Sequence, residues 1–596
     1  MTTSFIHPAL ILMFGALILP FIKEPFRKIY LCSVPILTFL DVIYLSWHPG
    51  VHGVVTFMGE WTLTFGRVDS LSMIFGFIMA LMAIIGTVYG LHVKDNLQHI
   101  ASWFYVSGSL GVIYCGDYLV LFLFWEMMAF ASTFLVWFNK DEGALAAGYR
   151  YLLVHTFGGV VLLLGFVLRY QATGDLSFVQ LDEQNTYLYT WLIMAGLMLN
   201  AAVPPLHSWL PDAYSKATVT GAVFMCAFTT KTAIYTLARA FAGFDILIVL
   251  GVIMAIYGII YAMMENDIRK LLGWEIVSQV GYMVAGVGIG TALAINGTCA
   301  HAFAHILYKG LLFMAAGAII HATGKSKFTE LGGLYKKMPS TLFFLVIGGI
   351  SVSAFPFFSG FVSKSMIISA GFESHLLLAG FLLTVVSVGT FLVAGLRLPY
   401  LIFFGENRCS EETWAKAEDP PWNMHLAMSA SAFLCLLIGS YTPFLYNMLP
   451  YADVTYHPYS GYHLSETLQI LAFTALAFVF LKDKLGPKES ISLDLDWFYR
   501  MGGRGFLWLA KNPIQWLDNV WGVAYRVVGL YTLMTTARFW SWFDWHAIDG
   551  VVDGSARCVR AVGRRVTIVL QRGQIQQTIY YSITFAAILL VSYVWL

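Results

Sequence analysis

The sequence has little charge. Asp, Glu, Lys and Arg make up 12% of its 596 residues, whereas hydrophobic residues make up 58%. This balance excludes a soluble domain, because a soluble surface of that size needs many more charged side chains. The apolar runs recur from end to end and can cross the ~30 Å hydrocarbon core of a bilayer as helices. The net charge of +1 offers no basic surface for nucleic acid. We therefore predict an all-α polytopic membrane protein.

Paired cysteines are also missing. Iron–sulfur clusters need grouped thiolates, and structural zinc needs paired ligands. We therefore predict no metal site and no cofactor, and we interpret the cysteines as small buried apolar residues. The seven are scattered, without a CxxC pair, at Cys32, Cys115, Cys226, Cys299, Cys409, Cys435 and Cys558.

The apolar runs predict about 16 spans, each with boundaries uncertain by a few residues. The first has no small-residue cleavage site, so we expect it to be retained. The predicted spans are 5–22, 29–47, 70–92, 100–116, 119–138, 151–170, 187–206, 219–241, 245–264, 271–290, 297–320, 341–371, 376–404, 424–446, 463–482 and 578–595.

Basic residues gather in alternate loops, while the other loops are acidic or nearly neutral. The positive-inside rule therefore predicts a protein of the cell inner (cytoplasmic) membrane with both termini on the outside. The basic loops hold Lys23, Arg27 and Lys28; Lys94; Lys140 and Arg150; Lys216; Arg269 and Lys270; and Lys325, Lys327, Lys336 and Lys337.

Two predicted spans are interrupted, at MLNAAVPPLHSWLPDA (198–213) and SVSAFPFFSGFVSKSMII (351–368). Proline breaks the helical ladder, and a broken helix at membrane depth must line protein or a water-filled cavity. Such paired breaks indicate inverted repeats with ion sites at mid-membrane. We predict two five-helix repeats, 100–241 and 245–404. The breaking residues are Pro204, Pro205, Pro356 and Gly360.

The rest of the chain completes the predicted layout. Residues 1–99 hold N-terminal spans and 405–482 hold accessory spans. Residues 483–575 interleave tryptophan with arginine, which is typical of an amphipathic helix lying along the membrane interface. A disordered linker is the alternative, although its composition would be poorer in aromatics. Residues 578–595 form a final anchor helix.

Ionisable residues stand inside the apolar runs, where they are costly and usually mark an ion path. His301, His305 and Lys309 lie at i, i+4 and i+8, so they share one stripe of a helix. Glu126, Lys231 and Lys364 lie in other spans, and the last follows the second break. A row of such groups can pass protons when the charge of each depends on its neighbour. For any one residue, a structural ion pair is the alternative.

Haem ligation is a rival interpretation of the histidines. It needs axial ligands from facing helices. The other candidates, His155, His207 and His321, lie near the ends of predicted spans and do not pair convincingly with His301 or His305.

At these residues the sequence resembles the antiporter-like proton-translocating family, which includes the antiporter-type subunits of complex I, the A-type and D-type subunits of Mrp sodium/proton antiporters, and equivalents in membrane-bound hydrogenases. The matching segments are LFLFWE with Glu126, PPLHSWLPDA, TTKTAIYTLAR with Lys231, NDIRKLLGWEIVSQVGYM, HAFAHILYKGLLF with His301, His305 and Lys309, and FSGFVSK with Lys364. The resemblance implies two half-channels joined by a hydrated polar axis.

One position departs from the family. The resemblance implies a lysine nine residues before the tryptophan of the first broken helix, and here that residue is Asn200. Asparagine orders water but cannot hold a proton. The charged partner of Glu126 is therefore missing from its usual place, and Lys231 is the candidate replacement.

Three functions remain open. The first is a proton-translocating subunit of a redox-driven membrane complex, similar to complex I or a hydrogenase, whose redox centres lie in partner subunits. The second is a sodium/proton antiporter subunit of the Mrp type, similar to the D-type one, with sodium as a second ion. The third is a scaffold with an impaired channel, suggested by Asn200. The expected partners are other membrane subunits and the lipid bilayer. Whether the chain counts as an enzyme depends on those partners.

Overall fold

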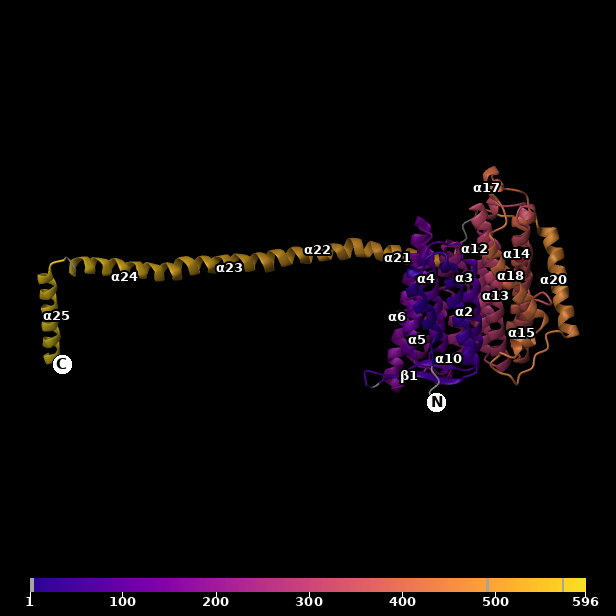
Figure 1. Cartoon of the computed structure of the whole chain (residues 1–596), viewed down its shortest axis with the longest axis horizontal. Helices are drawn as coiled ribbons and strands as arrows, with labels where there is room; N and C mark the ends of the chain where they lie inside the picture. The colour runs from indigo at the N-terminus through magenta and orange to yellow at the C-terminus, as the bar shows by residue number, and fades with distance from the viewer. Residues whose placement is uncertain (1–4, 60, 489–492, 571–572, 596) are drawn as a thin grey trace. The chain divides into compact units, whose positions relative to one another are not determined.

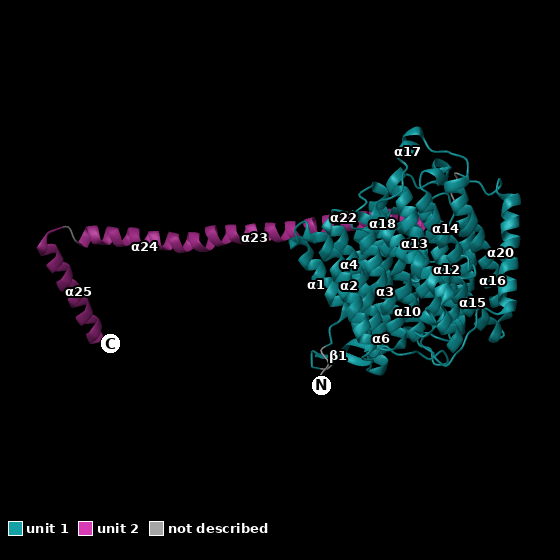
Figure 2. Ribbon diagram, turned by 45° about the vertical axis from the view of Figure 1, so that its right-hand side comes forward, with its two compact units in different colours: residues 1–496 teal, residues 497–596 magenta. Residues whose placement is uncertain are grey.

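The computed structural model describes residues 5–59, 61–488, 493–570 and 573–595. It divides into two compact units, residues 1–496 and 497–596, which Figure 2 shows in different colours. The larger unit is a bundle of helices. The smaller unit consists of α21 to α25.

The N-terminal part of the bundle contains a hairpin that our span prediction does not include. Strands β1 and β2 pair antiparallel, from Gly50 opposite Val68 to Phe57 opposite Trp61. They are too short for a search based on long apolar runs. The elements here are α1 (Pro8–Ile18), η1 (Leu19–Phe21), α2 (Phe26–Ser46), β1 (Gly50–Phe57), β2 (Trp61–Val68) and α3 (Ser70–Tyr89).

The middle of the bundle contains both predicted breaks. The first part comprises α4 (Asn96–Tyr114), α5 (Tyr118–Trp137), α6 (Glu142–Thr173), α7 (Leu188–Asn200), α8 (Trp209–Lys216), α9 (Val219–Ala227) and α10 (Thr229–Ala240). The second comprises α11 (Asp245–Met264), α12 (Ile268–Ile289), α13 (Ala292–Thr323), η2 (Phe328–Glu330), η3 (Leu334–Lys336), α14 (Pro339–Val352), α15 (Ser359–Glu373), α16 (Leu377–Thr390) and the π-helical η4 (Phe391–Arg397) and η5 (Tyr400–Phe404).

The bundle ends with α17 (Glu411–Lys416), α18 (Trp422–Ser440), α19 (Pro443–Tyr446) and α20 (Gly461–Leu481). Among the described residues, eleven helices are long and apolar enough to cross a membrane. The polytopic α-helical fold is thus confirmed, while the count of sixteen spans stays a prediction.

Each predicted break contains an alanine in the left-handed region, which is strained for a residue with a side chain. Ala202 has φ 60° and Ala354 has φ 58°. A third break divides the predicted span 219–241 at Phe228, between α9 and α10. The local sequence MCAFTTK has neither proline nor glycine, so no breaking residue announces this interruption.

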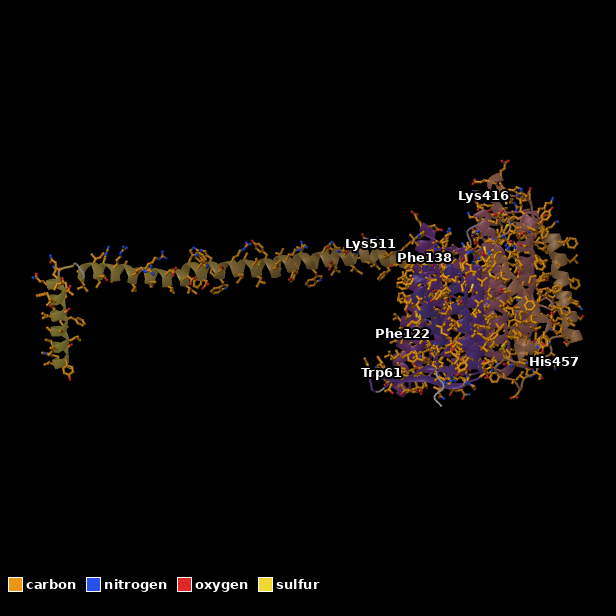
Figure 3. All side chains as sticks on the ribbon, in the orientation of Figure 1. Trp61, Phe122, Phe138, Lys416, His457 and Lys511 are labelled. Carbon is orange, nitrogen blue, oxygen red and sulfur yellow. The ribbon has the colours of Figure 1, made fainter. Side chains whose placement is uncertain are left out.

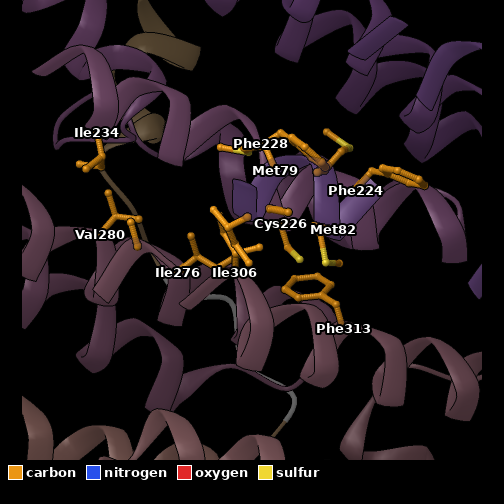
Figure 4. Close-up of a cluster of buried hydrophobic side chains, with 14 of the residues drawn as sticks. Met79, Met82, Phe224, Cys226, Phe228, Ile234, Ile276, Val280, Ile306 and Phe313 are labelled. Atoms are coloured by element: carbon orange, nitrogen blue, oxygen red, sulfur yellow. The ribbon is translucent and has the colours of Figure 1, made fainter. Parts of the chain in front are cut away.

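Helix α13 lies at the centre of the bundle and packs against α3, α9, α12, α14, α15 and α18 (Figure 1). Figure 4 shows part of the apolar cluster around it, in which Met82, Cys226 and Phe313 come from three different helices. In the apolar part of α13, 94% of the residues are buried. The polar stripe predicted on this helix therefore lies inside the protein and away from lipid.

The two ends of the bundle differ in charge. Lys416 lies at one end, while Trp61 and His457 lie at the other (Figure 3). Lys416 belongs to a loop of the same parity as the predicted basic loops. The alternation of basic and nearly neutral loops therefore matches the two ends of the bundle.

The smaller unit is almost one continuous helix before its last segment. Helical segments alternate with π-helical turns, and none of its described side chains is buried within the unit. The segments are α21 (Asp496–Leu509), η6 (Ala510–Ile514), α22 (Gln515–Ala524), η7 (Tyr525–Tyr531), α23 (Thr532–Phe543), η8 (Asp544–Ile548), α24 (Asp549–Leu570) and α25 (Ile575–Trp595).

The last residues of the larger unit are held at the first break by Asp494. Its carboxylate accepts hydrogen bonds from Ser208 and from Tyr257, the latter at 2.6 Å, and lies 3.3 Å from His207 Nε2. Burial raises the pKa of Asp494, but the bonds from His207, Ser208 and Tyr257 outweigh burial and lower that pKa to about 2. The ionised carboxylate is therefore the bound form at neutral pH.

We expect Asp494→Asn to loosen this attachment. Because the pKa of the folded state lies below the usual value of about 3.9, the stabilisation is complete above that pH and is lost as pH falls toward 2. At pH 7 the substitution removes bonds to a charged group, each contributing roughly 1.5–3 kcal/mol. Trypsin cleavage after Lys488 should accelerate. The control is Asp453→Asn in an exposed loop, and equal rates in both variants would contradict the attachment.

Candidate functional site

The central feature of the site is a buried ion pair between α12 and α13. Lys309 Nζ lies 2.7 Å from Glu275 Oε2, and both side chains are 0% exposed. Lys309 was predicted as a site residue, whereas Glu275 was not. The predicted stripe is present, since His301 and His305 on the same helix are also fully buried.

Lys231 lies at the break between α9 and α10. Its Nζ donates to the carbonyl oxygen of Cys226 at 2.6 Å. Cys226 is in the last turn of α9, where carbonyls lack partners within the helix and the helix dipole favours a cation. The break thus supplies the acceptor that allows an amine to be buried here.

Lys364 is held in the same way at the second predicted break. Its Nζ donates to the carbonyl oxygen of Val352, the last residue of α14, at 2.9 Å. The amine also lies 5.1 Å from the centre of the Tyr282 ring, within range of a cation–π interaction. Two buried lysines are therefore bound by the carboxyl ends of broken helices.

The three lysines and two histidines form one electrostatic group. His305 interacts with the charges of Lys231, Lys309 and Lys364. His301 Nδ1 lies 3.2 Å from Ser363 Oγ, next to Lys364 in sequence. The ring nitrogens of His305 have no partner among the described residues. The structure therefore brings together Lys231, His305 and Lys309, with His301 leading toward Lys364.

Glu126 stands apart from this group. Its Oε1 has no hydrogen-bond partner, and no ion pair of the described residues includes it. It packs against α6 at Gly159, where an added Cβ would lie 1.8 Å from the Glu126 oxygen. The expected pairing of Glu126 with Lys231 is not present in this structure.

Asn200 binds a histidine. Its Oδ1 lies 2.8 Å from His155 Nδ1, and both residues are buried. Our placement of His155 near a span end is wrong, because Asp141 caps α6 and the helix begins at Glu142, well before the predicted span. The contact gives the first break a neutral pair where the family resemblance implies a lysine.

A cavity of about 480 Å³ reaches Lys364. It is lined by Ser369 and Glu373 of α15, His457, and Glu466 of α20, among others. His457 lies at the end of the bundle opposite Lys416 (Figure 3). Lys364 itself is 1% exposed, so the cavity meets the buried group at its innermost point.

Two residues of the site were missed by the sequence analysis, Glu275 and His155. Glu275 lies in GWEIVSQ, within a segment that we matched as a whole. Its signal was the charge itself, since a carboxylate inside an apolar span needs a partner. Among the described residues, no three His, Cys, Asp or Glu side chains gather as a metal site would require.

We expect Asn200→Ala to destabilise the bundle, because it leaves His155 Nδ1 buried without a partner. The cost of such a loss is about 1–3 kcal/mol. Thermal unfolding of the purified protein in detergent would measure it. Asn185→Ala, in an exposed loop, is the matched control. An unfolding temperature equal to that of the control would show that the buried contact contributes nothing.

Comparisons with known proteins agree with this geometry. Residues 115–392 match the family described as NADH:quinone oxidoreductase/Mrp antiporter, TM. The A-type subunit of an Na⁺/H⁺ antiporter from Alkalihalophilus pseudofirmus is 30% identical over 402 residues, which are 60% of this chain and 50% of that relative. The chain thus spans half the length of this relative.

Two solved structures share the fold. One is a chain of the Mrp complex from Dietzia sp. DQ12-45-1b, with a TM-score of 0.69, 20% identity, and coverage of 78% of this chain and 98% of that chain. The other belongs to the archaeal membrane-bound sulfane sulfur reductase, with a TM-score of 0.65, 23% identity, and coverage of 78% and 97%. This chain is therefore a multi-pass membrane protein, and the family resemblance is confirmed: residues 115–392 belong to the NADH:quinone oxidoreductase/Mrp antiporter transmembrane family.

Proposed function

We propose that this protein is a proton-translocating subunit of a multi-subunit membrane complex. The observation that carries the proposal is the buried group of Lys231, His305, Lys309 and Lys364, with His301 beside it. Ionisable residues are expensive inside a membrane protein, and interacting ones in a single group serve proton transfer better than they serve stability.

The proposed relay works by repulsion between neighbouring charges. Lys309 interacts with both Lys231 and Lys364. Like charges close together disfavour each other's protonated form. A proton that arrives on one amine therefore promotes release from the next, and the charge moves along the row toward Lys364.

Water is expected to connect the amines. Buried polar atoms without protein partners normally bind water. Three sets of such atoms occur near the row: both ring nitrogens of His305, Oε1 of Glu275 and Oε1 of Gln279. They suit a hydrated axis in the membrane interior.

The proposed arrangement contains two inverted five-helix repeats, 100–241 and 245–404. Supporting it, each region holds one of the predicted breaks and a central helix of 32 residues, α6 or α13. The cavity at Lys364 would exchange protons with the side of His457, which is the outside if the basic loops face the cytoplasm. Residues 483–575 would lie along the membrane interface beside partner subunits.

Substitution of the relay lysines tests this function. We expect Lys364→Ala and Lys231→Ala each to lower proton transport by vesicles containing the intact complex at least about tenfold, because a relay needs every titratable step. Lys416→Ala is the control, since Lys416 forms an exposed pair with Glu412. Glu126→Gln tests the first half separately.

Undiminished transport in Lys364→Ala and Lys231→Ala would refute the relay. If deletion of residues 497–596 then destroyed the complex while the lysine variants assembled and transported normally, the scaffold function would replace it.

A sodium/proton antiporter component is the second candidate. The observation that favours it is the 30% identity with the A-type subunit of an Na⁺/H⁺ antiporter. The long helix of residues 496–570 favours a larger assembly, since its apolar and aromatic side chains have no cover within its own unit.

Purification of the intact complex in mild detergent distinguishes the two candidates. We expect mass spectrometry to identify partner subunits that bear iron–sulfur, nickel or flavin sites, as a redox-driven pump requires. If only small hydrophobic subunits co-purify, the redox-driven proposal is wrong. Dependence of proton transport on sodium would then be the next measurement.

A further inference from the structure

Two parts of the bundle correspond at a separation of 150 residues. Helices α6 and α13 each have 32 residues, beginning at Glu142 and Ala292. Each ends at a left-handed glycine, Gly174 with φ 67° and Gly324 with φ 68°. The same offset relates two isolated β-bridges, Asp117–Ser177 and Asp267–Lys327. The correspondence therefore extends over the helices, their caps and the loops around them.

The correspondence assigns equivalent positions on the two central helices. His155 on α6 is equivalent to His305 on α13, and Gly159 is equivalent to Lys309. On the preceding helices, Glu126 and Glu275 each follow a tryptophan. Each of these glutamates meets its central helix at the equivalent position, because Glu126 packs on Gly159 and Glu275 binds Lys309. The same carboxylate position thus faces a glycine in one half and an amine in the other.

We propose that Glu275 is a positioning residue for proton transfer, which holds the charge on Lys309 and then passes its support to Lys364. This inference rests on the proposed proton-transporting function. Glu275 does not carry the proton. It determines which of two neighbouring amines is charged.

The geometry supports a carboxylate shared between two amines. One oxygen of Glu275 binds Lys309, while the other has no partner among the described residues. Glu275 also interacts electrostatically with Lys364. In the transfer, an N–H bond of the Lys309 ammonium breaks and an N–H bond forms on the neutral amine of Lys364, through water. Glu275 stays ionised, and its free oxygen is available to the new cation.

A purely structural ion pair is the alternative, because breaking a buried pair destabilises a protein whatever its function. Three variants separate the two roles. Glu275→Gln removes the charge. Glu275→Asp keeps the charge but shortens the side chain by one methylene. The double variant Glu275→Lys with Lys309→Glu keeps the pair and reverses it, which places a carboxylate in the row of amines.

Proton transport is measured in vesicles containing the intact complex, after the amount of assembled complex has been checked. We expect Glu275→Gln to lower the rate about tenfold or more, as expected for the loss of a charge-assisted hydrogen bond. Glu275→Asp should assemble like the wild type and retain an intermediate rate, because its reach to the second amine is shortened. The reversed pair should assemble yet transport poorly. Glu265→Gln, which alters an ion pair with Lys270 near the start of the same helix, is the matched control.

Wild-type rates in Glu275→Gln, or in the reversed pair, would overturn the inference. If Glu275→Gln fails to assemble, Glu275→Asp decides, and an unchanged rate in that variant also overturns it. Lys364→Ala is measured in parallel. Loss of transport in Lys364→Ala but not in the Glu275 variants would reject only the role of Glu275, whereas normal transport in both would also reject the proposed function.

Discussion

The cost of holding an amine inside a membrane protein shapes the centre of this molecule. Each of three buried lysines meets that cost differently. Lys309 has a carboxylate partner at 2.7 Å, whereas Lys231 and Lys364 donate to backbone carbonyls at the ends of α9 and α14. A carbonyl is free to accept only where its helix has ended. Two of the interruptions in the bundle can therefore be understood as the source of these acceptors, and the apolar packing around α13 keeps lipid away from all three amines.

Carbonyl and carboxylate partners have different consequences for transport. A carbonyl at a helix end is a fixed, partial charge, so it stabilises a cation without responding to neighbours. A carboxylate has a full charge and two oxygens, and its side chain can change partner. Glu275 is therefore the adjustable element between two fixed sites. Gly360 allows the close approach that the second break needs, because a Cβ there would lie 1.9 Å from the Ser351 carbonyl oxygen.

Much of the architecture followed from the sequence, because its signals were local. Apolar length predicted the helices, proline and glycine predicted two breaks, and the i, i+4, i+8 spacing placed His301, His305 and Lys309 on one buried stripe. Partners were less predictable, since they depend on contacts between distant segments. Glu275 meets Lys309 across 34 residues, and the break at Phe228 has no local marker. The 150-residue correspondence was present in the sequence, but its significance depended on knowing where α6 and α13 end.

The two halves of the bundle separate the requirements of folding from those of transport. Around α6, the helix length, the glycine cap and the broken neighbour match those around α13, yet Gly159 stands where Lys309 would be and Asn200 binds a neutral histidine. The shape therefore forms without a central ion pair. Removing one partner of a buried pair typically costs about 3–5 kcal/mol, but replacing both by neutral residues is often harmless. Since the first half shows a neutral version of this site, the charges of the second half are not a condition of the fold, and their retention there is best explained by what they do to a moving proton.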